Sequence, residues 1–161
     1  MNHNIYFIYG LPGSGKTTYS IELYQELITS DDPDKYKIIH LDDYFQGNIN
    51  TLIDDIYNDK DHIYIIEGVD IPRIVYDGKL LYSFKCYFLI LDCNIIKCVI
   101  RKIRREYKEY KNTISKWVMI KYTPNMIKGY YKTYKHYIHQ FNKFKKYLDN
   151  HMYTPSYIKT S

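Results

Sequence analysis

Apolar residues along this chain follow two alternating patterns, which predict strands and helices in turn. Four continuous runs have the β-branched and aromatic character of strands buried on both faces of a parallel sheet. They cover residues 4–9, 36–41, 62–66 and 85–91. Elsewhere apolar residues recur every three or four positions, which predicts helices. These begin after the segment 10–17, near residue 50, at residue 94 and near residue 124. Strands alternating with helices predict an α/β fold with a parallel sheet of four to five strands and a helical C-terminal part.

Three segments refine this outline. Residues 71–84 predict no clear element, because Pro72 and Asp77-Gly78 interrupt the pattern. Thr123-Pro124 is typical of an N-cap and first helical turn, so the long C-terminal helix is predicted over about 124–149. The polar tail, 150–161, is predicted to cover the surface or fray. Without internal repeats or a domain linker, residues 1–161 are predicted to form a single domain.

Composition restricts the classes of protein that this chain can belong to. A length of 161 residues with 45% hydrophobic residues suits one packed domain. Cys86, Cys93 and Cys98 lack a CxxC pair, which argues against a disulfide framework or a zinc ribbon. With no secretory signal and no membrane-spanning run, the chain is predicted to be soluble and cytoplasmic. A net charge of +5 suits polyanionic ligands without requiring nucleic acid.

The first apolar run leads into a glycine-rich segment of defined spacing. Residues 10–17 read Gly-Leu-Pro-Gly-Ser-Gly-Lys-Thr, which is the phosphate-binding P-loop pattern GxxxxGK[ST] between a predicted strand and a predicted helix. The glycines let successive N–H groups form a nest for phosphate oxygens. Lys16 supplies charge to the outer phosphates, and Thr17 a hydroxyl for Mg²⁺. The predicted nucleotide-binding residues are Gly10, Gly13, Ser14, Gly15, Lys16, Thr17 and Thr18.

Acidic residues follow the second and third predicted strands. Asp42-Asp43 comes after the second strand, and Glu67-Gly68 ends the third. In open α/β sheets ligands bind beyond the carboxyl ends of the strands. These acids are therefore predicted to lie on the same side of the sheet as the P-loop.

Four segments in this order resemble the uridine kinase group of P-loop kinases, which includes nicotinamide riboside kinases and phosphoribulokinase. They are Gly-Leu-Pro-Gly-Ser-Gly-Lys-Thr-Thr at 10–18, Leu-Asp-Asp-Tyr-Phe at 41–45, Ile-Ile-Glu-Gly-Val at 65–69 and Arg-Lys-Ile-Arg-Arg-Glu at 101–106. The resemblance covers residues 4 to about 135. It implies a three-layer α/β/α P-loop NTPase fold, ATP and Mg²⁺ as cofactors, and transfer of the γ-phosphoryl group of ATP to a hydroxyl of a nucleoside-like small molecule.

The resemblance also implies roles for individual residues. Lys16, Asp42, Arg101 and Arg105 would be catalytic, with Asp42 orienting and deprotonating the acceptor hydroxyl. Thr17, Asp42 and Glu67 would hold Mg²⁺, and the arginines would belong to a lid over about 101–120. Simpler interpretations remain open. Asp42 and Asp43 are also typical of a capped turn, Glu67 of a solvated strand end, and the arginines of a basic surface helix.

The acceptor is the part that the sequence leaves open. About two dozen residues separate Asp42 from Glu67, which is short for the hairpin that covers the base in uridine kinases. The region after Glu106 also lacks the Arg-Gly-Arg-Asp run of their lid. One alternative is a polynucleotide-type kinase that uses the Tyr- and Lys-rich stretch 122–147, although the helical periodicity of that stretch favours packing on the sheet. Another is a nucleotide-binding module without an acceptor.

Overall fold

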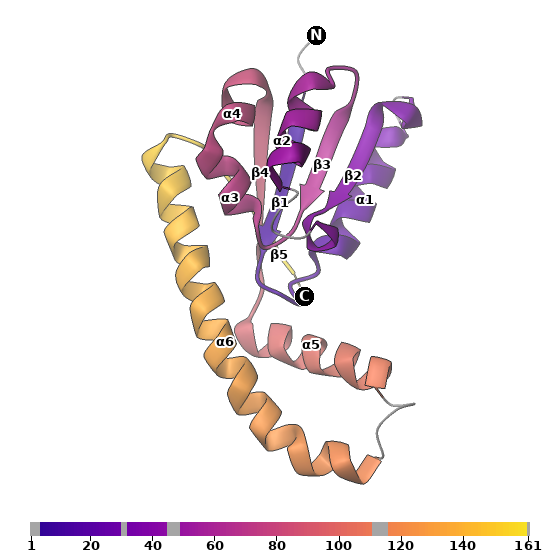
Figure 1. Cartoon of the computed structure of the whole chain (residues 1–161), viewed down its shortest axis with the longest axis vertical. Coiled ribbons are helices and arrows are strands. Elements are labelled where there is room, and N and C mark those ends of the chain that lie inside the picture. The colour runs from indigo at the N-terminus through magenta and orange to yellow at the C-terminus, as the bar shows by residue number, and fades with distance from the viewer. Residues whose placement is uncertain (1–3, 30–31, 45–48, 111–115, 161) are drawn as a thin grey trace.

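A sheet of parallel strands forms the centre of the computed structural model, which describes residues 4–29, 32–44, 49–110 and 116–160 (Figure 1). The strands are β1 (Asn4–Gly10), β2 (Tyr36–His40), β3 (Ile63–Glu67), β4 (Lys85–Asp92) and β5 (Ser156–Lys159). Within these residues the order across the sheet is β2-β3-β1-β4-β5. Phe45 and the stretch 111–115 of the predicted lid lie outside the described residues. The α/β fold and its parallel sheet are confirmed.

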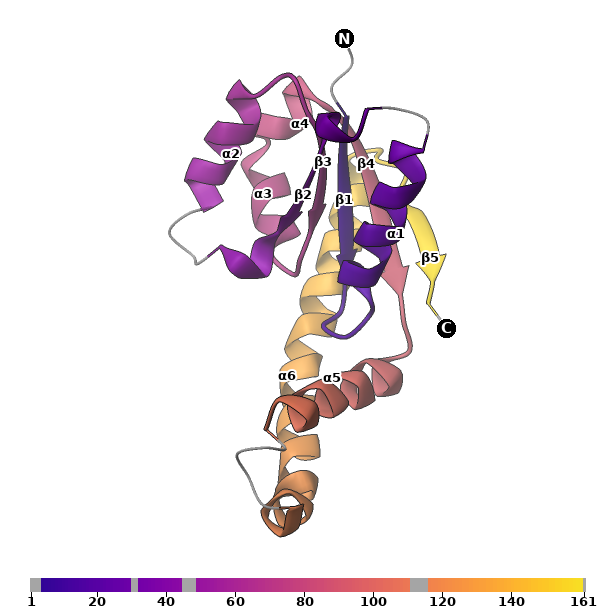
Figure 2. The same cartoon turned by 90° about the vertical axis from the view of Figure 1, so that its right-hand side faces the viewer.

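Helices cover both faces of the sheet, which makes three layers (Figure 2). The helices are α1 (Lys16–Ile28), α2 (Ile49–Asn58), α3 (Ile71–Asp77), α4 (Lys79–Ser83), α5 (Ile95–Tyr110) and α6 (Lys116–Asn150). On one face, Leu23 and Leu27 of α1 pack against buried Ile8 and Ile65. Helices α2, α3, α4 and the C-terminal half of α6 bury the opposite face. The predicted three-layer arrangement is therefore correct.

The core explains why β1 is the central strand. Ile5, Phe7 and Ile8 have no exposed surface, because β1 has a neighbouring strand on each edge and helices on both faces. Phe7 stacks on Phe88 of β4, with ring centroids 5.4 Å apart. Continuous apolar runs of this kind are typical of parallel strands. The four strands predicted from such runs each lie within a residue or two of their observed bounds.

Pro72 and Gly78 delimit helices in the segment 71–84, for which the sequence predicted no element. Pro72 lies in the first turn of α3, where its missing N–H has no intrahelical partner to lose. Gly78 has a left-handed φ of +80°, and it ends α3 and precedes α4. Both residues therefore act as helix boundaries in a segment that is otherwise helical.

The C-terminal part differs from the prediction in two places. Helix α6 begins at Lys116, so Thr123-Pro124 lies inside the helix and is not its N-terminus. The tail was predicted to cover the surface or fray, but residues Ser156–Lys159 form β5. Ile158 of β5 packs with Leu89 and Leu91 of β4, which gives this polar segment enough apolar contact to join the sheet edge.

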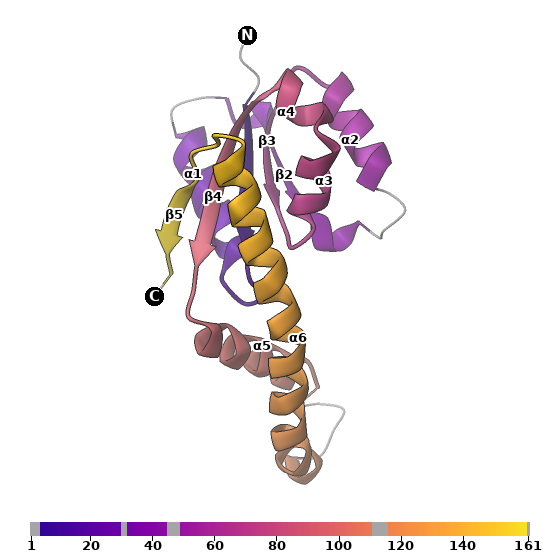
Figure 3. The same ribbon diagram turned by 90° about the vertical axis from the view of Figure 1, so that its left-hand side faces the viewer.

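Helix α6 runs along the sheet and continues beyond it, as Figures 1 and 3 show. In its C-terminal half, Phe141 stacks on Tyr9 and Phe144 contacts both Tyr9 and Phe88. Its N-terminal half projects past the carboxyl ends of the strands together with α5 (Figure 1). The two helices thereby form a projecting arm next to the edge of the sheet where the P-loop lies.

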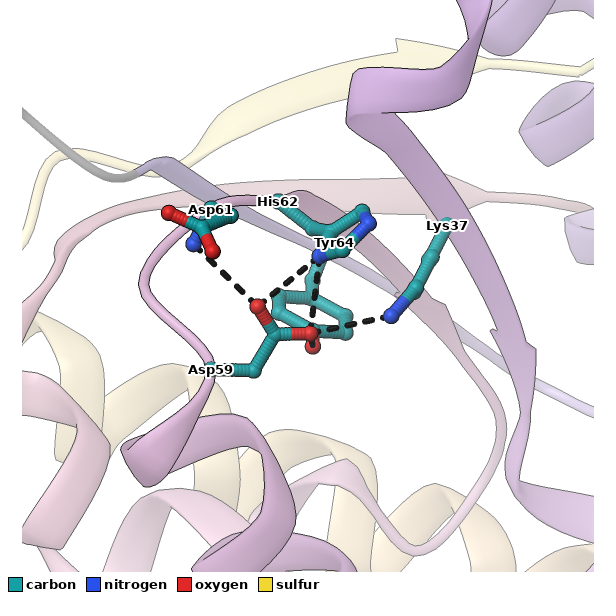
Figure 4. A network of polar contacts seen from close by, with 5 residues as sticks. All are labelled: Lys37, Asp59, Asp61, His62 and Tyr64. Atoms are coloured by element: carbon teal, nitrogen blue, oxygen red, sulfur yellow. Dashed lines mark hydrogen bonds and ion pairs between the residues drawn. The ribbon is translucent and has the colours of Figure 1, made fainter.

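A polar network closes the opposite end of the sheet, at the amino ends of β2 and β3 (Figure 4). The Asp59 carboxylate accepts hydrogen bonds from Tyr64 Oη at 2.6 Å, Lys37 Nζ at 2.9 Å and the Asp61 N–H at 3.1 Å. His62 Nδ1 lies 2.8 Å from it. Burial raises the pKa of Asp59, but these hydrogen bonds outweigh burial and hold that pKa well below its usual range.

Asp59→Asn is expected to lower the free energy of unfolding by about 1.5 kcal/mol at pH 7. A carboxyl group whose pKa is depressed in the folded state stabilises the protein above its unfolded pKa of about 4, and this contribution is lost as the pH falls through the folded-state pKa. The difference between Asp59→Asn and wild type should therefore shrink between pH 7 and pH 3. Urea unfolding at both pH values measures it.

Asp61→Asn is the matched control for this change, because Asp61 enters the network through its backbone N–H. It should leave the free energy of unfolding nearly unchanged at pH 7. An equal loss for Asp59→Asn at pH 7 and pH 3 would contradict a role for the Asp59 charge.

Candidate active site

The segment 10–17 forms a tight loop between β1 and α1. Its N-terminal turn is closed by a hydrogen bond from the Ser14 N–H to the Leu11 carbonyl at 3.0 Å. Gly13 and Gly15 have φ angles of +79° and +96°, which side chains disfavour, and Lys16 begins α1. The backbone thus curls around the N-terminus of a helix that follows the central strand of a parallel sheet. The chain has the P-loop NTPase fold.

The P-loop is packed tightly against its surroundings. A Cβ added at Gly13 would lie 2.5 Å from the carbonyl oxygen of Cys98, at the start of α5. A Cβ added at Gly10 would lie 2.6 Å from Ser14 Oγ and 3.1 Å from Leu91. Glycine at these positions therefore lets neighbouring backbone and side chains approach the loop closely.

Lys16 lies inside the loop, with 7% of its surface exposed. Its Nζ donates hydrogen bonds to the carbonyls of Gly10 and Leu11, each at 3.2 Å. Burial lowers the pKa of Lys16, while the carboxylates of Glu67 and Asp42 oppose that shift. Lys16 lines the same cavity as these two acids, which the sequence predicted to lie on this side of the sheet.

Glu67 at the end of β3 connects the P-loop to β2. Its Oε1 accepts a hydrogen bond from Thr17 Oγ1 at 2.8 Å and lies 2.8 Å from Nδ1 of His40. The parallel register pairs His40 with Glu67. Glu67 is buried, with 4% of its surface exposed, so these two contacts fix its orientation. Nothing in the local sequence around His40 predicts this contact, because it depends on the register of β2 and β3.

A cavity of about 500 Å³ opens at the carboxyl ends of the strands and collects most of the predicted site residues. The predicted residues that line it are Gly13, Gly15, Lys16, Thr17, Thr18, Asp42, Glu67, Arg101 and Arg105. Tyr44, Asp70, Lys102 and Tyr137 line it too, and of these the sequence reasoning assigned no role to Asp70, Lys102 or Tyr137. Asp43 and Arg104 are exposed and do not line this cavity.

Arg101 reaches the loop from α5. Its Nη1 donates a hydrogen bond to the Gly13 carbonyl at 3.4 Å and lies 3.7 Å from Cys93 Sγ. Arg105, one turn further along α5, lines the same cavity. The i, i+4 spacing predicted that both side chains share a helix face, and both do point to this cavity.

A second cavity, of about 440 Å³, lies on the other side of the P-loop. Gly15, Thr18 and Arg101 line both cavities, so the two meet at the loop. Ser14, which does not line the first cavity, lines this one. The remaining walls include Tyr19 of α1 and the segment 158–160, which contains the end of β5. The loop therefore lies between two hollows of similar size.

Helix α6 is tied to the loop by Tyr134, which the sequence reasoning also missed. Its side chain is 1% exposed, and its hydroxyl donates a hydrogen bond to the Pro12 carbonyl at 2.5 Å. The Tyr134 hydroxyl is protonated as a donor at neutral pH, and burial raises its pKa further above the ordinary value of about 10. The helical periodicity of the stretch 122–147 predicts packing on the sheet, but it does not predict a contact with the loop.

Tyr134→Phe is expected to lower the free energy of unfolding by about 1–2 kcal/mol, because it leaves the Pro12 carbonyl without its donor. Packing of the ring is kept. Urea unfolding measures the loss, and Tyr131→Phe, at an exposed position on the same helix, is the control. Equal small effects of the two changes would show that the hydrogen bond to Pro12 contributes little.

The oxygen atoms near Thr17 suit Mg²⁺. Thr17 Oγ1 and Glu67 Oε1 are 2.8 Å apart, and Asp42 lines the same cavity. Mg²⁺ usually binds one or two protein oxygens together with nucleotide phosphates, so a dedicated cluster of ligands is not needed. Within the described residues, no group of three or more His, Cys, Asp or Glu side chains is arranged to hold a metal. Thr17, Glu67 and Asp42 are the residues that would contribute.

Comparisons with known proteins add little to this site. No family model matches the chain, and no curated protein sequence matches it. Among solved structures, the crystal structure of APE1195 is 14% identical with a TM-score of 0.49, covering 71% of this chain and 77% of that one. Thymidylate kinase from Ehrlichia chaffeensis is 12% identical with a TM-score of 0.46, covering 100% of this chain and 90% of that one. Over the described residues, no helix is long and apolar enough to cross a membrane.

Proposed function

We propose that this chain is a kinase that transfers the γ-phosphoryl group of ATP to a hydroxyl group of a small molecule. The observation that carries the proposal is the position of the P-loop between two cavities that meet at Gly15, Thr18 and Arg101. A kinase must bind a donor and an acceptor on either side of the transferred group. A nucleotide switch that only hydrolyses its ligand needs the donor side alone.

On the donor side, the triphosphate would lie in the P-loop. Backbone N–H groups of the loop and the N-terminus of α1 would bind its oxygens, with Lys16 next to the outer phosphates. Thr17 and Glu67 would hold Mg²⁺, which supplies charge neutralisation when bound. The second cavity, on the β5 side, is large enough for the nucleoside part.

On the acceptor side, Asp42 would accept the proton of the attacking hydroxyl. The acceptor oxygen forms a bond to the γ-phosphorus while the bond from that phosphorus to the bridging oxygen of ADP breaks. Arg101 and Arg105 line the cavity where negative charge develops in this step. Arg101 already contacts the loop through the Gly13 carbonyl, which favours a role close to the phosphates.

The finer expectation, drawn from the resemblance to the uridine kinase group, is a nucleoside-like acceptor and a cytoplasmic enzyme of one domain. The motifs at 41–45 and 65–69 support the phosphoryl-transfer part of this expectation, since Asp42 and Glu67 line one cavity with Lys16. A polynucleotide end as acceptor, or nucleotide binding without an acceptor, are the competing outcomes of the test below.

The test is release of ADP from ATP with Mg²⁺ against a panel of nucleosides, nucleoside monophosphates, ribosyl compounds, pantothenate and 5′-hydroxyl oligonucleotides. Acceleration by a small molecule is expected, and product analysis should find phosphate on its hydroxyl. Acceleration by oligonucleotides alone, with a steep salt dependence, would favour a polynucleotide kinase. Slow ADP release that no compound changes would contradict the proposal and favour a binding module.

A further inference from the structure

A third cavity, of about 330 Å³, continues the acceptor side of the site away from the P-loop. Val69 and Asp70 line both this cavity and the large one, so the two are adjoining. Its far walls come from α3 and α6, which contact each other where Tyr76 meets Phe144 and Tyr147. Figure 3 shows α3 and α6 side by side over the same face of the sheet.

The far walls of this cavity carry two positive charges. Arg73 projects from α3 and Lys143 from α6, and both line it together with Gln140. Among the described residues, neither Arg73 nor Lys143 forms an ion pair. Arg73 and Lys143 are therefore exposed cations without an ion-pair partner among the described residues, beside a cavity that Asp70 also lines.

Charge changes sign along the path from the P-loop to this cavity. Asp42 lines the large cavity, and Asp70 lies where the two cavities adjoin. Arg73 and Lys143 line the far cavity and not the large one, and Lys143 also borders a further hollow with Lys146. A hydroxyl donates a hydrogen bond to a carboxylate, while phosphate and carboxylate groups bind guanidinium and ammonium groups. A molecule with a hydroxyl at one end and an anionic group at the other matches this order.

We infer that the acceptor of the proposed kinase carries an anionic group, a phosphate or a carboxylate, and that Arg73 and Lys143 bind it. This inference rests on the proposed function for the identity of the reacting end. The planar fork of Arg73 suits two oxygens of one such group, and Lys143 adds a point charge from the opposite wall. An uncharged nucleoside would leave both cations without a partner.

The experiment compares matched pairs of ligands that differ only in the anionic group. The pairs are uridine with uridine 5′-monophosphate, ribose with ribose 5-phosphate, and panthenol with pantothenate. The first two pairs test for phosphate and the third for carboxylate. Binding is measured by calorimetry with the P-loop saturated by a non-hydrolysable ATP analogue and Mg²⁺, so that it does not depend on turnover.

In at least one pair, the anionic member is expected to bind at least about tenfold more tightly. Arg73→Gln and Lys143→Gln should each reduce that preference about tenfold. Lys132→Gln is the matched control: Lys132 is an exposed lysine of α6 that lines none of the three cavities, so its replacement should keep the preference. Both test residues are exposed, and unchanged unfolding midpoints of the ligand-free variants confirm that they fold.

Other results overturn the inference. It fails if no anionic member binds, if both members of every pair bind equally, or if Lys132→Gln reduces the preference as much as Arg73→Gln does. ADP release measured with the same compounds separates a failure of the anion site from a failure of the proposed kinase activity. Transfer to neutral compounds alone would support the proposed kinase activity and contradict an anionic acceptor. Anion binding that depends on Arg73, without phosphoryl transfer to any compound, would support the anion site and contradict the proposed kinase activity.

Discussion

Asp42→Asn is expected to lower turnover at least about a hundredfold, which corresponds to about 2.7 kcal/mol of transition-state stabilisation. The amide keeps the size of the side chain but cannot accept the proton of the attacking hydroxyl. The dissociation constant of ATP should stay within about twofold, because the P-loop backbone and Lys16 make most of the expected phosphate contacts. ADP release at saturating acceptor and calorimetry with ATP measure the two quantities.

Asp43→Asn is the matched control for Asp42. The two aspartates are neighbours in the same short 3₁₀ turn, Leu41–Asp43, and both are exposed, but only Asp42 lines the cavity. Asp43→Asn should therefore keep nearly full turnover. Equal losses for both variants would mean that the turn matters as a structural unit, and that Asp42 has no part of its own in the reaction.

Gly13→Ala is expected to lower the free energy of unfolding by at least about 3 kcal/mol. Its φ of +79° disfavours any residue with a Cβ, and that Cβ would lie 2.5 Å from the Cys98 carbonyl oxygen, which is backbone and has little freedom to move. Either the loop or the start of α5 must shift. Nucleotide binding should be lost with the loop geometry, as calorimetry with ATP would detect.

Gly15→Ala separates the backbone strain of a positive φ from the steric clash with α5. Gly15 has a φ of +96°, yet an added Cβ there meets no described atom within 4 Å. Its cost should be limited to backbone strain of about 1–2 kcal/mol. Urea unfolding of both variants gives the difference between their free energies of unfolding. This difference measures how tightly α5 packs against the loop at Gly13. If Gly15→Ala is as destabilising as Gly13→Ala, that packing is not the reason for glycine at position 13.

The parts of the molecule that follow local rules were predictable. The P-loop spacing and its strand-and-helix context predicted the nucleotide-binding segment, and the rule for parallel sheets placed Asp42 and Glu67 at the edge where the loop lies. Both acids line the cavity with Lys16. Long apolar runs predicted four strands because burial on both faces leaves little ambiguity in the pattern.

The missed features depend on contacts between distant residues. His40 contacts Glu67 because β2 and β3 pair in one register, and Tyr134 reaches Pro12 because the fold brings α6 next to the loop. Strand β5 is polar on most positions, and only Ile158 contributes to the core, so its pattern resembles a loop. The sequence around Pro72 and Gly78 predicts interruptions, whereas these residues mark where helices start and stop.

The pairing of β5 with β4 has a consequence for how the chain folds. Leu89 pairs with Ser156, and both α5 and α6 lie between them in the sequence. Closing so long a loop costs more conformational entropy than forming the local units around β1, so β5 is expected to join the sheet late. Until it does, the outer edge of β4 carries free N–H and C=O groups beside apolar side chains. Refolding should therefore compete with self-association, and yields should fall as the protein concentration rises.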